Sequence, residues 1–309
     1  MSNVSIANLS GVIPPVIVPL NDDRSFDRES YVTHLERLIA SGVHGLFILG
    51  SSGEVAFSTR ERRQEILEAT MSIVDGRLPV LAGVVDTQTE RVLEHVRDAE
   101  AAGVDGLVAT APFYALGGLE VVEAHFRAIA KATDLPVYAY DIPVCVNVKL
   151  PVDLLMRLAA DGVIAGVKDS SGDDVAFRWL CQANEDAGHP LRIFTGHEVV
   201  VDGAYLSGAD GSVPGLGNVD PDGYVRQWDA YQNGDWETVR AEQERIARLM
   251  HIVTVTSGVS GFGAGIGGFK TALQLLNVIK TNQMPLPVAR MEGENVEAVR
   301  KVLQEANLI

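Results

Sequence analysis

The sequence is poor in cysteine and its histidines are not clustered. The two cysteines, Cys145 and Cys181, cannot form the disulfide framework that staples small secreted domains, and they fit a reducing compartment. The seven histidines are scattered, without an H-x-x-x-H pair or a Cys/His cluster. Such spacings supply the ligands of most zinc sites, so a metal-dependent aldolase or hydrolase is disfavoured and we expect no metal site.

Positive charge is also scarce, and no long apolar run is present at the start of the chain. There are 25 Lys and Arg against 41 Asp and Glu, a formal net charge of −16. A surface this acidic repels nucleic acid and anionic membranes, so we expect neither as a partner. Residues 1–20 lack a basic region, and their short apolar run is interrupted by prolines at positions 14, 15 and 19. This pattern is typical of neither a signal peptide nor a membrane span, and it predicts a cytoplasmic protein.

Short apolar runs rich in β-branched residues alternate with longer amphipathic stretches. Glycines at positions 42, 103 and 162 close helical stretches, among which 28–42, 60–74 and 89–103 are the most regular. Buried strands separated by helices predict a parallel sheet whose outer side is covered. Eight such units favour an α/β fold of the (β/α)8 TIM-barrel type over an open doubly wound sheet. The expected strands are 11–19, 45–50, 79–84, 106–110, 136–142, 163–169, 191–196 and 210–215.

Three further helical patterns follow the eighth unit, near 236–256, 265–281 and 293–307. They predict a C-terminal helical region, residues 236–309, packed on a barrel formed by residues 1–235. The run 263–268 has the spacing G-x-G-x-x-G, but it does not follow a strand within a βαβ unit. We therefore interpret it as a mobile or tightly packed loop rather than a dinucleotide site, and we expect no organic cofactor.

The active site of a TIM barrel lies at the carboxyl ends of its strands, where Lys168 is the most informative residue. It follows the apolar run VIAGV and is the only one of six lysines at the end of an expected strand. A buried ammonium is costly, and burial leaves more of the neutral amine that attacks a carbonyl. In the alternative interpretation, Lys168 reaches solvent from the strand end or pairs with Asp169 or Asp141.

Two other groups at expected strand ends suit a carbonyl substrate. Tyr140 ends the neighbouring strand, where a phenol can carry protons to and from a carbinolamine, although it could also be a core tyrosine, as we expect for Tyr138. Ser51 and Ser52, in the turn GSSGE, offer hydroxyl and backbone N–H donors to a carboxylate. Serines that cap an ordinary turn between strand and helix are the alternative for that pair.

Five motifs follow one another along nearly the whole chain: GSSGE (50–54), PFY (112–114), YDIP (140–143), GVKDSSGD (166–173) and GADGSVPGLGN (208–218). In order and spacing they resemble the dihydrodipicolinate synthase/N-acetylneuraminate lyase family of class I, pyruvate-type aldolases. The resemblance implies a lysine imine with pyruvate or another 2-oxo acid, an aldehyde as the second partner, and no cofactor. It also implies a homotetramer built as a dimer of dimers.

The resemblance implies a role for each matching residue. Lys168 matches the Schiff-base lysine, and Tyr140 matches the tyrosine that relays protons. Ser51 and Ser52 match the hydroxyl pair that holds the pyruvate carboxylate, and Ser51 is also placed to relay a proton. Tyr114 matches a catalytic tyrosine that reaches into the neighbouring subunit's site. Further substrate contacts are expected from Gly53, Cys145, Asn147, Ser170, Gly196, Glu198 and Val213.

The chain departs from its relatives where the second substrate would bind. Cys145 stands where lysine-biosynthetic members have an arginine, and a thiol cannot replace a bidentate guanidinium. Asp141 replaces the usual Asn, and Asn147 stands where related chains have Gly; both Asn and Gly tolerate positive φ. Sialic-acid lyases have two adjacent acidic residues where this chain has Glu198 followed by valine, and a serine in place of Gly215.

Taken together, the sequence predicts a lyase that cleaves or forms a C–C bond between pyruvate and an aldehyde, on a 2-keto-3-deoxy sugar acid. A keto-deoxy sugar-acid dehydratase that uses the same imine is an alternative. So is an activity like that of N-acetylneuraminate lyase or dihydrodipicolinate synthase. Outside the enzymes, a keto-acid-binding sensor would need Ser51 and Ser52 but neither Lys168 nor Tyr140.

Overall fold

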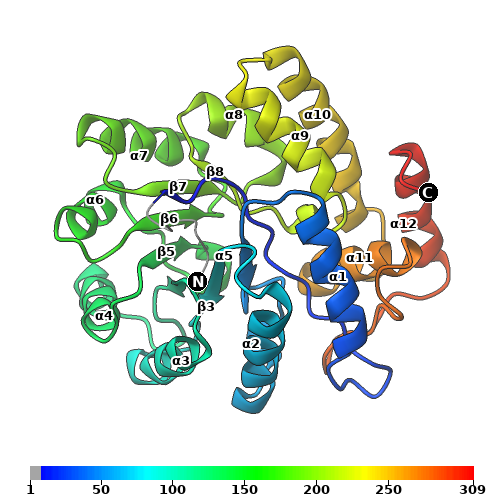
Figure 1. The fold of residues 1–309 in the computed structure, drawn as a ribbon, viewed down its shortest axis with the longest axis horizontal. Helices are drawn as coiled ribbons and strands as arrows, with labels where there is room; N and C mark the ends of the chain where they lie inside the picture. Colours follow the sequence, from blue (N-terminus) through cyan, green and yellow to red (C-terminus); the bar gives the residue numbers. More distant parts are fainter. Residues whose placement is uncertain (1–7) are drawn as a thin grey trace.

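A single parallel sheet of eight strands forms the centre of the molecule (Figure 1). The computed structural model describes residues 8–309, so the beginning of the N-terminal segment interpreted above, residues 1–7, lies outside the described residues. The strand order is β1-β8-β7-β6-β5-β4-β3-β2. The strands are β1 (Gly11–Val12), β2 (Leu46–Ile48), β3 (Val80–Gly83), β4 (Gly106–Thr110), β5 (Val137–Asp141), β6 (Gly166–Asp169), β7 (Arg192–Thr195) and β8 (Gly211–Ser212).

The sheet closes into a barrel where the chain after β1 meets β2. Pro15 pairs with Phe47 in a parallel bridge, the Val16 N–H donates to the Phe47 carbonyl over 2.8 Å, and the Phe47 N–H donates to Pro14 over 3.1 Å. The predicted (β/α)8 barrel is therefore confirmed. The expected first strand, 11–19, was too long, because its prolines have no N–H to donate to a ladder.

Helices surround the strands, as Figure 1 shows. Those predicted at 28–42, 60–74 and 89–103 are found as α1, α2 and α3, and Gly103 ends α3 with a φ of 81°. Side chains of Asp27 and Thr59 cap α1 and α2 by accepting backbone N–H groups. The helices up to residue 232 are α1 (Arg28–Ala40), α2 (Arg60–Val74), α3 (Thr89–Ala102), α4 (Leu119–Lys131), α5 (Pro143–Val146), α6 (Val152–Ala160), α7 (Asp174–Asp186), α8 (Val201–Leu206) and α9 (Pro221–Gln232). Short 3-10 turns lie at η2 (Val55–Phe57), η3 (Glu198–Val200) and η4 (Gly215–Asn218).

Three helices and one 3-10 turn follow the barrel units: α10 (Trp236–Leu249), η5 (Met250–Val253), α11 (Gly261–Leu275) and α12 (Glu294–Glu305). The loop expected at 263–268 is wrong, because these residues belong to α11. A Cβ on Gly268 would lie 3.0 Å from Ile252, so the glycine lets α11 pack closely against η5, and this packing outweighs the low helix propensity of glycine. A division of the chain at residue 235 stays a prediction.

Candidate active site

Lys168 and Tyr140 face each other across neighbouring strands at the carboxyl-terminal mouth of the barrel. They are paired in the register of β5 and β6, and both side chains are buried, with 6% and 3% of their surface exposed. The Lys168 Nζ atom lies 4.1 Å from the centre of the Tyr140 ring and 4.9 Å from that of Phe47 on β2. Aromatic ring faces attract a cation without neutralising it. In residues 8–309 no carboxylate forms an ion pair with Lys168.

The next residue along each strand points the other way, because side chains alternate across a sheet. Asp141 and Asp169 follow Tyr140 and Lys168, are almost fully buried, and both pair with the ammonium of Lys149. Asp141 also accepts the Leu150 N–H over 3.1 Å, and Asp169 accepts the Ser171 N–H over 2.7 Å. The alternative in which Lys168 pairs with Asp141 or Asp169 is therefore wrong, because both carboxylates form their ion pair with Lys149.

Of the groups behind the site, Asp141 and Lys149 have shifted pKa values. Burial raises the pKa of Asp141 to about 6, with the nearby Asp169 charge adding to the effect and Lys149 opposing it. Burial lowers the pKa of Lys149, but the charges and hydrogen bonds of Asp169 and Asp141 together outweigh it, so the pKa is raised. The Lys149 charge is therefore retained at neutral pH, and it compensates two acids that lie next to the two central side chains of the site.

Gly196 allows close approach at the end of β7. Its N–H donates to the Asp169 carbonyl over 2.7 Å. A Cβ at this position would lie 3.3 Å from Lys168 Cε and would overlap the Ser170 hydroxyl. The structure thus places Gly196 and Ser170, both predicted as substrate contacts, directly beside Lys168.

The GSSGE turn lies against the same group of side chains. A Cβ on Gly50 would come within 2.6 Å of the Phe47 ring, so the turn packs on the ring that faces Lys168. Ser51 is partly exposed, whereas Ser52 is buried. A side chain at Gly53 would be crowded by backbone, since a Cβ there would lie 3.2 Å from the Val16 carbonyl oxygen. The two serines therefore stand on a tightly packed backbone near the lysine.

Glu198 and Val213 come from the ends of β7 and β8. A Glu198 carboxylate oxygen accepts the Leu216 N–H over 2.5 Å, and burial raises the pKa of Glu198 to about 7, against the opposing effects of that hydrogen bond and of Lys168. The Val213 N–H donates to the Thr195 carbonyl over 2.8 Å. Glu198 thus binds the backbone of η4 while lying close enough to Lys168 to interact with its charge.

The remaining predicted residues lie at the outer edge. Cys145 is exposed on α5, and Asn147 ends that helix with a φ of 56°, as expected for an Asn in place of Gly. Tyr114 is 93% exposed and has a φ of 73°. Its side chain therefore does not pack into this subunit's own barrel.

Sequence reasoning missed Phe47, Lys149 and Lys270. Phe47 could have been noticed from alternation within its strand, because it points into the barrel. The partners of Lys149 and Lys270 carry no local signal, since each pairing depends on the folded chain.

Among residues 8–309, no group of three or more His, Cys, Asp and Glu side chains is placed to hold a metal ion. No helix in this part of the chain has the length and apolar character needed to cross a membrane.

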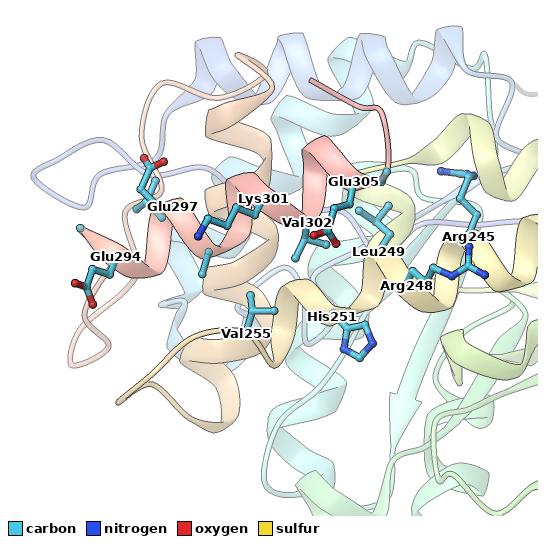
Figure 2. A pocket seen from close by; sticks show the side chains of 14 residues that line it. Arg245, Arg248, Leu249, His251, Val255, Glu294, Glu297, Lys301, Val302 and Glu305 are labelled. Carbon is cyan, nitrogen blue, oxygen red and sulfur yellow. The ribbon is translucent and has the colours of Figure 1, made fainter.

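A separate hollow of about 1110 Å³ lies between α10 and α12 (Figure 2). Leu249, Val255 and Val302 supply apolar surface, and charged side chains of both signs, including Arg248 and Glu297, surround it. None of the residues predicted for the active site lines it. The hollow is therefore separate from the candidate site around Lys168 and Tyr140.

A closed (β/α)8 barrel with a buried lysine at the end of its sixth strand has the make-up of a class I, lysine-dependent lyase. The chain belongs to the dihydrodipicolinate synthetase family, whose sequence model matches residues 8–306. It is therefore a lyase of the class I aldolase type, and the resemblance drawn from the five motifs is confirmed.

Individual relatives support the same assignment. An uncharacterized DapA-like lyase of Halobacterium salinarum is 36% identical over 267 residues, which are 83% of this chain and 86% of that protein. The dihydrodipicolinate synthase of Bacteroides thetaiotaomicron superposes with a TM-score of 0.90 at 32% identity, covering 96% of this chain and 98% of that one. YagE, a prophage protein of Escherichia coli K12 solved in complex with pyruvate, gives 0.91 at 25% identity, with 97% and 99% covered.

Proposed function

We propose that Lys168 forms an imine with the ketone of a 2-keto-3-deoxy sugar acid, and that the enzyme cleaves this substrate to pyruvate and an aldehyde. The observation that carries the proposal is the setting of Lys168: buried beside Tyr140, with both adjacent carboxylates paired to Lys149 instead. The neutral form of such an amine is the nucleophile that attacks a carbonyl carbon.

The reaction follows from this arrangement. The neutral Lys168 amine attacks C2 of the keto acid, and the carbinolamine loses water to give a protonated imine. A base, which we assign to Tyr140, takes the proton of the C4 hydroxyl. The C3–C4 bond breaks, its electrons move into an enamine, and the aldehyde leaves. Protonation at C3 and addition of water then release pyruvate and restore the amine, so no metal or organic cofactor is required.

The substrate carboxylate is assigned to the Ser51–Ser52 turn, which packs on the Phe47 ring beside Lys168. A hydroxylated chain is favoured over a second carboxylate, because Cys145 stands at the edge of the site without a guanidinium. We extend the proposal to a cytoplasmic homotetramer, in which the exposed Tyr114 contributes to a neighbouring subunit's site. Sedimentation analysis that finds only a monomer at working concentration would contradict the tetramer.

Intact-mass analysis after addition of pyruvate and sodium borohydride tests the imine. We expect the wild-type chain to gain one reduced pyruvate on the peptide that contains Lys168, and Lys168→Ala to gain none. Lys149→Arg is the matched control, because it keeps a cation between Asp141 and Asp169 and should still form the adduct. No adduct on wild type with pyruvate or with longer 2-keto-3-deoxy acids would refute the imine and favour a keto-acid sensor.

Product analysis separates the aldolase from the dehydratase. Cleavage of a 2-keto-3-deoxy acid yields pyruvate and a shorter aldehyde, whereas dehydration keeps every carbon of the substrate in one oxo acid. Incubating the enzyme with such an acid and measuring pyruvate release therefore decides between them.

A further inference from the structure

A second lysine, Lys270 of α11, is buried more completely than Lys168. None of its surface is exposed, and its Nζ atom lies 2.7 Å from a carboxylate oxygen of Glu54, which is 3% exposed. The same ammonium donates to the Gln283 carbonyl over 2.9 Å. Glu54 is the last residue of the GSSGE turn, so this ion pair joins a C-terminal helix directly to the turn that contains Ser51 and Ser52.

The buried ion pair between Glu54 and Lys270 is not an efficient way to stabilise the contact between these two segments. Burial raises the pKa of Glu54 and lowers that of Lys270, in each case against the attraction between the two charges. An apolar pair of similar volume often gives equal or greater stability at such a site. What a buried ion pair adds is a fixed position for both partners, because neither charge can move away from the other without losing its compensation.

The position of Glu54 is transmitted to the serines through a short piece of rigid backbone. The Glu54 N–H donates to the Ser51 carbonyl over 3.1 Å, and the Val55 N–H donates to the Gly50 carbonyl over 3.4 Å. Glu54 itself has a φ of 57°, a conformation that a residue with a side chain adopts only when its surroundings hold it. The turn and the Glu54 side chain therefore move together.

Helix α11 contacts the mouth of the barrel at other points as well. The rings of Phe57, just after the turn, and Phe262 lie 5.0 Å apart. On the other side, a Cβ on Gly215 would come within 2.8 Å of the Phe269 ring, and Phe269 is the neighbour of Lys270. One helix thus packs on the segments that follow both β2 and β8, and Lys270 is its charged contact with the serine turn.

We infer that Lys270 is a positioning residue for substrate binding: through Glu54 it holds Ser51 and Ser52 where they receive the carboxylate of the keto acid. The inference rests on the proposed function, since it takes the serine turn as the carboxylate site. It gives the C-terminal helices a part in catalysis, although Lys270 touches neither the substrate nor Lys168.

Three variants test the inference: Lys270→Met, Glu54→Gln and the double variant. We expect either single change to raise the KM for the keto acid, and the half-saturating pyruvate concentration in borohydride trapping, by about tenfold or more, with kcat lowered less than about threefold. The double variant leaves no unpaired buried charge and should recover much of the lost stability, but its KM should stay raised because the contact that positions the turn is absent. Asn282→Ala is the matched control, because it removes buried hydrogen bonds to Thr271 and Met291 in the same region without touching the turn.

The outcomes separate this inference from the proposed function. If wild type forms no adduct, the imine itself is wrong. If wild type and Lys270→Met trap pyruvate with the same half-saturating concentration while only the melting temperature falls, Lys270 is merely structural and the inference is overturned. It is also overturned if Asn282→Ala, at an equal loss of melting temperature, raises KM as much as Lys270→Met does.

Discussion

The two faces of the sheet at the ends of β5 and β6 carry opposite kinds of chemistry. On the inner face, Tyr140 and Lys168 lie together with aromatic rings around the ammonium. On the outer face, one residue further along each strand, Asp141 and Asp169 share the ammonium of Lys149. Because a step of one residue reverses the direction of a side chain, two adjacent positions can hold an amine among aromatic rings and an acid paired with a cation, on separate faces. The chemistry open to each lysine therefore depends on the side chains around it, and those are determined by the face of the sheet on which it lies.

Tyr140→Phe gives the largest effect that tests the inner face. The change keeps the ring beside Lys168 and removes only the hydroxyl, so we expect kcat to fall by roughly 10² to 10⁴, the usual contribution of a positioned acid or base. Steady-state kinetics of pyruvate release would measure it. Borohydride trapping should still label Lys168 at long incubation, since the nucleophile remains.

Tyr138→Phe is the matched control on the same strand and the same face. Tyr138 lies two residues deeper in the barrel, where its ring centre is 6.2 Å from that of Phe194, and burial raises the pKa of its hydroxyl. We expect kcat within about threefold of wild type, because this phenol is a core residue one pleat below the reacting atoms. If the two variants lost activity equally, Tyr140 would have no special role and the inner face would be only a packing surface.

The inner face could largely be predicted from the sequence, whereas the outer face could not. Lys168 and Tyr140 each follow an apolar run, and the strand period places them at the barrel mouth. Lys149 lies after a break in that periodicity, and nothing near it in the sequence shows that it returns to Asp141 and Asp169. Lys270 and Glu54 are more than two hundred residues apart, so their pairing depends on where α11 packs. The same packing explains why the glycine-rich run 263–268 is helical.

Lys149→Met tests whether the outer face is held by charge compensation. Removing the ammonium leaves Asp141 and Asp169 buried without a cation, and breaking a buried pair in this way typically costs about 3–5 kcal/mol. Since Lys149 itself is 31% exposed, we expect a smaller loss, about 2–3 kcal/mol in the free energy of unfolding at pH 7.5, measured by urea denaturation. The loss should shrink at pH 5, where Asp141 can take up a proton.

Lys149→Arg is the control for this prediction. It keeps a cation and should stay within about 1 kcal/mol of wild type. An equal loss in both variants would mean that packing of the lysine stem, and not its charge, stabilises the outer face.

Asp141→Asn should alter only how stability depends on pH, and it tests the sign of the balance on the outer face. Burial raises the pKa of Asp141 from 3.8 to about 6, against the opposing pull of Lys149. Between these values the folded chain binds more protons at this carboxyl than the unfolded chain does, so its contribution to stability is greatest at low pH and falls as pH rises through the range. The difference in unfolding free energy, wild type minus variant, should therefore decrease by up to about 3 kcal/mol between pH 4 and pH 7, while all other titrations largely cancel. Asparagine can still accept the Leu150 N–H, which limits the change to the charge. A difference that instead increased with pH would show that the attraction between Asp141 and Lys149 is larger than the cost of burying the carboxylate. The charges of the outer face would then stabilise the fold.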